Sequence, residues 1–231
     1  MTAKLTGPRI DPKGGAAKQL VVFLHGYGAD GNDLIELGAQ WRALLPHATF
    51  VSPHAPERCA ASPTGRQWFG LTSVAPEDPK GAAERLSGVV SARPTIDAFL
   101  DEELARLGLD ESRLALVGFS QGAMMALHVG LRRPRAPAAI IGYSGLLVGA
   151  ETLDEAGARN PRGERPPILL VHGDQDPLIP VDALFGAMND LGAAEIPSQW
   201  HLSFGVGHGI DAGGLRHGGL FLAQGFGIKA R

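Results

Sequence analysis

Residues 114–129 read LALVGFSQGAMMALHV, and this stretch decides the expected fold. A short apolar run comes first, then Gly118-Phe119-Ser120-Gln121-Gly122, then an apolar run typical of a helix. The turn fits G-x-S-x-G, in which a serine occupies a strained corner between a strand and a helix. Glycine is needed on each side because the flanking segments nearly touch and a Cβ would clash. We therefore predict a strand, a tight turn and a helix, with Ser120 at the positive N-terminal end of that helix.

Composition limits the class of protein. The chain has 231 residues, which suits one α/β domain covering residues 1–231. Its net charge of −3 predicts no strong attraction to nucleic acid. The single cysteine, Cys59, cannot form an internal disulfide, which fits a reducing compartment. The first ten residues lack the apolar core of a signal peptide, and no run approaches the roughly 20 apolar residues of a membrane span. We expect a cytoplasmic protein without stable membrane insertion.

Strand patterns alternate with helix patterns along the chain. Apolar runs that read as buried strands lie at 20–24, 48–52, 114–117, 138–142 and 168–171, with a last strand at 199–204. Strands that are apolar on both faces are typical of a parallel sheet. The sequence therefore predicts a mostly parallel, doubly wound central sheet with helices on both faces. Residues 53–82 show no clear period, and we expect them to form a loop region that flanks the active site.

Three side chains that follow separate strands could form a catalytic group. A serine hydroxyl is a poor nucleophile unless a base lies within hydrogen-bond reach and an acid orients that base. Ser120, Asp176 and His208 occur in the order serine, acid, histidine that accompanies this kind of turn. In an open α/β sheet the carboxyl ends of the strands meet at one edge. We predict Ser120 as the nucleophile, Asp176 as the acid and His208 as the base.

Other residues compete for the first two of these roles. Asp174 lies closer to the strand end than Asp176 and could brace the turn instead. We prefer Asp176 because Pro177 stiffens the loop directly after it. Ser144 lies in the sequence GYSGL, where a leucine replaces the last glycine of the pentapeptide, so it is a weaker nucleophile candidate.

The base and the oxyanion contacts follow from the same loops. Of the eight histidines, His25 and His172 also follow strands, but they come before or beside the acid. His208 lies between two glycines on a late loop that follows a strand, which gives it the correct order. Backbone amides should stabilise the negative oxygen of the tetrahedral intermediate. We predict the amide of Gln121, directly after the nucleophile, and that of Tyr27 in the loop HGYG (25–28).

At this point the sequence resembles the phospholipase/carboxylesterase family of α/β-hydrolases, which includes the acyl-protein thioesterases. The matching segments are FLHGYGADGNDL (23–34), RQWF (66–69), GFSQGAMMAL (118–127), SG (144–145), HGDQDPLIP (172–180) and GVGHGI (205–210). The resemblance implies the α/β-hydrolase fold and the same catalytic and oxyanion residues. It also implies catalysis without a metal or cofactor. Members of the family often pair as dimers, so a homodimer is a candidate assembly.

The activity implied by the resemblance is that of a serine carboxylesterase. Such an enzyme hydrolyses short- to medium-chain carboxylic esters through an acyl-enzyme, and acyl thioesters or lysophospholipids are further candidate substrates. Tyr27 stands where the family usually has leucine, and Gly70 where an acid is common, so substrate preference does not carry over. The alternatives are other chemistry on the same fold, as a peptidase or a lactone hydrolase, and a non-catalytic binding protein.

Two groups of residues have competing interpretations. The first could shape an acyl pocket or pack in the core, and it comprises Trp68, Phe69, Leu71, Leu178 and Ile179. The second is the basic cluster Arg132, Arg133 and Arg135 after the nucleophile helix, which we expect to be a solvated surface.

Overall fold

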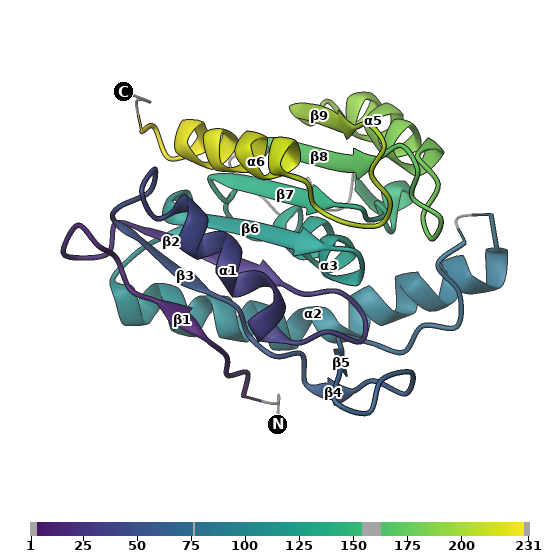
Figure 1. Cartoon of the computed structure of the whole chain (residues 1–231), viewed down its shortest axis with the longest axis horizontal. Helices are drawn as coiled ribbons and strands as arrows, with labels where there is room; N and C mark the ends of the chain where they lie inside the picture. Colours follow the sequence, from purple (N-terminus) through teal and green to yellow (C-terminus); the bar gives the residue numbers. More distant parts are fainter. Residues whose placement is uncertain (1–3, 76, 154–162, 229–231) are drawn as a thin grey trace.

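The computed structural model describes residues 4–75, 77–153 and 163–228 (Figure 1). Its centre is a seven-stranded sheet with the strand order β1-β3-β2-β6-β7-β8-β9. The strands are β1 (Arg9–Ile10), β2 (Gln19–Leu24), β3 (Ala48–Val51), β6 (Leu114–Phe119), β7 (Ala139–Tyr143), β8 (Ile168–Gly173) and β9 (Ser198–Ser203). Only the β1–β3 pair of this sheet is antiparallel, so the predicted mostly parallel sheet is confirmed.

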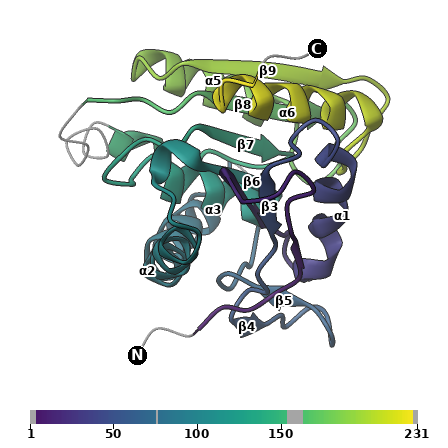
Figure 2. The same ribbon diagram turned by 90° about the vertical axis from the view of Figure 1, so that its left-hand side faces the viewer.

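Helices cover both faces of the sheet, as predicted (Figure 2). On one face, α1 (Gly31–Trp41) and α6 (Ala212–Gly225) share one apolar layer with Val21 and Phe23 of β2. On the other face, α2 (Pro79–Leu107), α3 (Gln121–Gly130) and α5 (Asp182–Ala193) share a second apolar layer with the alternate side chains of β2. Strand β2 is buried along its whole length because successive side chains enter opposite layers.

The helix starts follow local capping rules. Asp30 caps α1, and its carboxylate accepts the amide of Asn32 at 2.7 Å. Asp78 caps α2 in the same way, with the amide of Lys80 at 3.1 Å. Within the described residues, every helix is too short or too polar to cross a membrane.

Residues 53–82 are more ordered than the sequence suggests. They include a two-stranded hairpin, β4 (Glu57–Arg58) with β5 (Arg66–Gln67), and α2 already begins at Pro79. The expectation of irregular chain up to residue 82 is therefore wrong for its last part. Proline reads as a helix breaker, but at the first position of a helix its missing amide donor costs nothing and its fixed φ is favourable.

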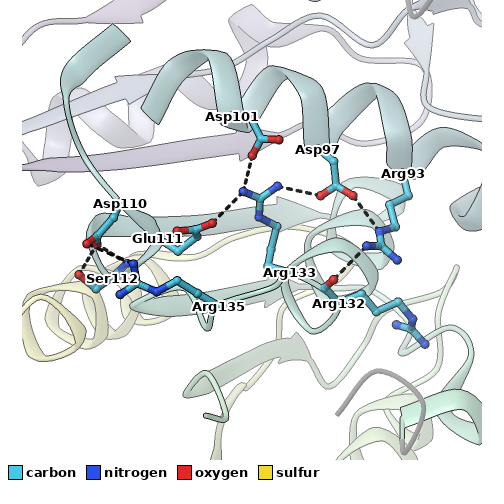
Figure 3. A network of polar contacts seen from close by, with 9 residues as sticks. All are labelled: Arg93, Asp97, Asp101, Asp110, Glu111, Ser112, Arg132, Arg133 and Arg135. Atoms are coloured by element: carbon cyan, nitrogen blue, oxygen red, sulfur yellow. Dashed lines mark hydrogen bonds and ion pairs between the residues drawn. The ribbon is translucent and has the colours of Figure 1, made fainter. Parts of the chain in front are cut away.

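The basic cluster after α3 is not a solvated surface, and that expectation is wrong for Arg132 and Arg133. Arg133 has a side chain that is only 3% exposed, and its guanidinium contacts three carboxylates (Figure 3). These are Asp97 at 3.1 Å and Asp101 at 2.5 Å from α2, and Glu111 at 3.3 Å from the short helix η1 (Glu111–Arg113). The network therefore joins the end of α3 to α2 and to the start of β6.

The two neighbouring arginines differ from Arg133 and from each other. Arg132 is also buried and donates to the carbonyls of His128 and Gly149, both at 3.2 Å. Arg135 remains partly exposed, and it meets Asp110 at 3.5 Å (Figure 3). A guanidinium at the surface gains little from such a pair, whereas a buried guanidinium depends on its partners.

Replacing Arg133 with methionine tests the network. Methionine keeps a long apolar stem but leaves Asp101 and Glu111 without their cation, and it leaves Asp97 with Arg93 alone. We expect the free energy of unfolding to fall by about 2–3 kcal/mol, less than for a fully buried pair, because the carboxylates keep some contact with water. Urea unfolding at pH 7 measures the change. The matched control is Arg135→Met, which should cost less than about 1 kcal/mol; equal losses in the two variants would contradict this assignment.

Candidate active site

The turn around Ser120 is strained in the way the motif requires. Ser120 has φ 53° and ψ −117°, in the left-handed region that residues other than glycine rarely adopt. A Cβ on Gly118 would lie 2.1 Å from the carbonyl oxygen of Gly122. A Cβ on Gly122 would lie 1.8 Å from the carbonyl oxygen of Leu24. Both glycines are therefore needed for β6, α3 and the end of β2 to meet at this corner.

Loops from neighbouring strands converge on the same corner. The amide of Ser120 donates to the carbonyl of Tyr143 at the end of β7, at 2.9 Å. A Cβ on Gly26, in the loop after β2, would lie 3.4 Å from the Cβ of Ser120. Ser144, the weaker nucleophile candidate, is fully buried, and its hydroxyl donates to the carbonyl of Gly209 at 3.4 Å. The edge of the sheet thus holds Ser120 among the loops that carry the other candidates.

Asp176 and His208 form a direct pair. Asp176 Oδ2 lies 2.7 Å from His208 Nδ1, and the carboxylate is fully enclosed while the imidazole keeps some exposure. Because a carboxylate only accepts, Nδ1 is the donor, which leaves Nε2 of the neutral ring as the basic nitrogen. The other carboxylate oxygen accepts the amides of Leu178 and Ile179, both at 2.9 Å.

The charge of Asp176 is stabilised in place. Burial alone would raise the pKa of this carboxyl, but hydrogen bonds from the amide of Ile179, from His208 and from the amide of Leu178 outweigh burial and lower the pKa. The group is therefore ionised at neutral pH. Its rival Asp174 instead accepts the amide of Gly205 at 2.6 Å.

The imidazole of His208 lies beside the nucleophile turn. Its ring packs against the ring of Phe119, the residue before Ser120, with 5.0 Å between ring centroids. Among the described residues, no hydrogen bond joins the Ser120 hydroxyl to His208. Such bonds are often long in unliganded active sites and shorten only when the substrate is bound.

The two predicted oxyanion donors are backbone amides that lack a backbone acceptor within the described residues. Gln121 is the first residue of α3, where an amide has no partner inside the helix. Tyr27 lies in a turn in which Ala29 donates to the carbonyl of Gly26 at 3.2 Å. The helix dipole of α3 adds positive potential at this end.

His25 cannot serve as the base, because both of its ring nitrogens are occupied. Nε2 accepts the amide of Ala55 at 3.0 Å, and Nδ1 lies 2.8 Å from the carbonyl of Gly26. A carbonyl only accepts, so this ring is neutral with its proton on Nδ1. Burial is the main cause that lowers the pKa of His25.

Asp176 has a second histidine neighbour, His172, which the sequence analysis missed. Its Nε2 lies 2.8 Å from the carbonyl of Ile179 and 3.4 Å from Asp176 Oδ2. The ring therefore supports the loop that holds Asp176. A histidine at a strand end four residues before the acid is the signal that could have suggested this role.

The predicted pocket residues divide by exposure. Trp68, Phe69 and Ile179 are buried in the core, which fits the packing alternative. Leu71 is partly buried and Leu178 is 53% exposed, so a pocket role for these two residues stays a prediction. No group of three or more histidine, cysteine or acidic side chains in the described parts of the chain is arranged to hold a metal ion.

Comparison with known proteins identifies the family. A family model described as Phospholipase/Carboxylesterase matches residues 5–218. This chain belongs to the phospholipase/carboxylesterase family. It is 33% identical over 183 residues to acyl-protein thioesterase 1 of Schizosaccharomyces pombe, and the match covers 78% of each chain.

Solved structures agree with the fold. Esterase PE8 is 44% identical, with a TM-score of 0.88 over 96% of this chain and 99% of its own. SOBER1 of Arabidopsis thaliana is 23% identical, with a TM-score of 0.77 over 90% of this chain and 98% of its own, and supports the fold alone. The prediction of an α/β-hydrolase fold is confirmed.

The close approach at Gly122 gives a stability test. Gly122→Ala places a methyl group against a main-chain carbonyl that cannot rotate away, so we expect a loss of at least about 3 kcal/mol or a failure to fold. The control is Gly186→Ala in α5, where a Cβ meets nothing within 4 Å. That change should stabilise the helix by about 0.5–1 kcal/mol. Thermal unfolding of both variants decides the point, and a Gly122→Ala protein as stable as the wild type would contradict the geometry.

The buried His25 predicts a pH dependence of stability. The folded state holds this ring neutral, whereas the unfolded chain takes up a proton near the ordinary pKa of 6.5. Stability from His25 is therefore complete above that pH and is lost as the pH falls below it. We expect His25→Gln to be less stable at pH 7.5 but to lose less further stability by pH 5.5 than the wild type. Urea unfolding at the two pH values measures the free energy of unfolding. Equal losses between pH 7.5 and pH 5.5 in the wild type and in His25→Gln would contradict this prediction.

Proposed function

We propose that this chain is a serine hydrolase that cleaves short- to medium-chain carboxylic esters through an acyl-enzyme. The observation that carries the proposal is the 2.7 Å hydrogen bond between the enclosed carboxylate of Asp176 and His208, at the sheet edge that also holds Ser120. An acid, an imidazole and a strained serine at one edge are the parts that serine hydrolases use.

In the first half of the reaction, the hydroxyl of Ser120 attacks the ester carbonyl while Nε2 of His208 takes its proton. Asp176 holds the ring by Nδ1 and stabilises the imidazolium that forms. The negative oxygen of the tetrahedral intermediate then accepts the amides of Tyr27 and Gln121. This requires the hydroxyl and the imidazole to approach each other when the substrate binds.

In the second half, His208 returns the proton to the leaving alkoxide as the bond to the acyl carbon breaks. A water molecule then attacks the acyl-enzyme, His208 takes one proton from that water, and Ser120 recovers it when the acid leaves. The same steps apply to a thioester, with a thiolate as the leaving group. The S. pombe relative is named as an acyl-protein thioesterase, which makes thioesters a second candidate substrate class.

A substrate series with three variants tests this proposal. p-Nitrophenyl esters of increasing chain length are assayed beside an acyl thioester and a lysophospholipid. We expect Ser120→Ala to lose about 10⁶-fold in kcat and Asp176→Asn about 10⁴-fold. The matched control is Asp174→Asn in the same loop, which should keep kcat within about tenfold of the wild type because Asp174 contacts a backbone amide and not the imidazole.

Chemical labelling separates catalysis from simple binding. A fluorophosphonate probe should modify the wild type and Asp174→Asn, and should fail to modify Ser120→Ala. Turnover that survives in Ser120→Ala would overturn the proposal. A wild-type protein that neither reacts with the probe nor cleaves any ester would favour the non-catalytic alternative.

Pairing as a homodimer stays a prediction of the family resemblance.

A further inference from the structure

Three buried side chains that the proposed mechanism does not use connect the two oxyanion loops. Gln121, Trp68 and His25 come from α3, from the segment after β5 and from the loop after β2. Their exposed fractions are 0%, 2% and 0%. Polar groups buried to this degree are usually hydrogen-bonded, so the partners of these three side chains show which segments they hold together.

Gln121 binds the main chain of the Trp68 segment with both ends of its side-chain amide. Its Oε1 accepts the amide of Trp68 at 3.0 Å, and its Nε2 donates to the carbonyl of Phe69 at 2.7 Å. A primary amide combines an acceptor oxygen with a donor nitrogen, whereas a glutamate carboxylate would lack the donor. Gln121, whose backbone amide is a predicted oxyanion donor, therefore also fixes the main chain of Trp68 and Phe69 through its side chain.

Trp68 passes this constraint to the loop that carries Tyr27. Its indole Nε1 donates to the carbonyl of His25 at 2.9 Å, and the two rings pack with 5.3 Å between centroids. The ring of His25 in turn accepts the amide of Ala55 and lies against the carbonyl of Gly26. The main chain directly before Tyr27 is thus held by side-chain contacts on two sides.

The main chain directly after Tyr27 is held by β5. Gly28 donates to the carbonyl of Arg66 at 2.9 Å, and Arg66 donates to the carbonyl of Ala29 at 2.7 Å. Tyr27 therefore lies between two fixed points, one reached through Trp68 and one through Arg66. Both points belong to the same short segment, 66–68, which Gln121 ties to the nucleophile turn.

We propose that Gln121, Trp68 and His25 are positioning residues that fix the spacing between the Tyr27 and Gln121 amides. The inference rests on the proposed function. Oxyanion donors act only when both lie about 2.7–3.1 Å from the place that the charged oxygen will occupy. Because a displacement of about 1 Å can cost about 10²-fold in rate, a rigid link between the two loops bears directly on kcat.

A second tryptophan offers a matched control for simple core packing. Trp41 is buried to a similar degree, and its Nε1 donates to the carbonyl of Leu215 at 3.0 Å. It packs in the layer on the opposite face of the sheet from Trp68. Trp41→Phe and Trp68→Phe therefore remove the same donor from two equally buried sites, of which only one faces the oxyanion loops.

The experiment compares these variants with a p-nitrophenyl ester and with an alkylboronic acid, which mimics the tetrahedral intermediate on a serine. We expect Trp41→Phe and Trp68→Phe to lower the melting temperature by similar amounts. Trp68→Phe should also lose about 10- to 100-fold in kcat with little change in KM, and should bind the boronic acid more weakly by a similar factor. Trp41→Phe should keep kcat and the inhibitor constant within about twofold of the wild type.

Gln121→Glu keeps the test valid if Trp68→Phe fails to fold. It retains the size of the side chain but loses the donor to Phe69, and should show the same loss in kcat without a change in KM. If Ser120→Ala is inactive while Trp68→Phe and Gln121→Glu match Trp41→Phe in kcat and inhibitor binding, the positioning inference is wrong and the proposed function stands. If Ser120→Ala is active, the proposed function itself fails.

Discussion

The contact between Gly122 and the end of β2 is the constraint on which the rest of the structure depends. The first turn of α3 lies so close to the carbonyl oxygens of Leu24 and His25 that only glycine fits. This approach holds Ser120 at a positive φ, which an isolated turn would not maintain. It also fixes where the loop after β2 can run. Strain in one residue and the position of the neighbouring loop therefore have a single cause.

Buried polar groups at this edge of the sheet are stabilised largely by main-chain atoms. The carboxylate of Asp176 accepts two amides in addition to the imidazole, and His25 contacts one amide and one carbonyl. A buried carboxylate or imidazole without such partners would cost several kcal/mol. Main-chain partners are also stiffer than side chains, so they set the orientation of the groups they hold. The edge of the sheet thus combines low exposure with defined geometry.

The sequence predicted those features that are encoded locally. The strands that are apolar on both faces and the glycines of the turn depend on neighbouring residues, and the structure contains them. The largest features that were missed depend on residues far apart in the chain. Arg133 meets Asp97 across 36 positions and Gln121 meets Trp68 across 53, and no periodic pattern records such partners. For the site, the sequence located the loops at the sheet edge but not the side chains that brace them.

The manner in which Asp176 is held has an evolutionary consequence. The carboxylate accepts the amide of Leu178, while Leu178 as a residue is 53% exposed. Almost any residue except proline can supply that amide. The identity of position 178 can therefore drift, and reshape the surface next to the histidine, without altering the charge or orientation of the acid. Divergence among relatives of this chain should concentrate at such positions, where the backbone has a fixed task and the side chain is free to vary.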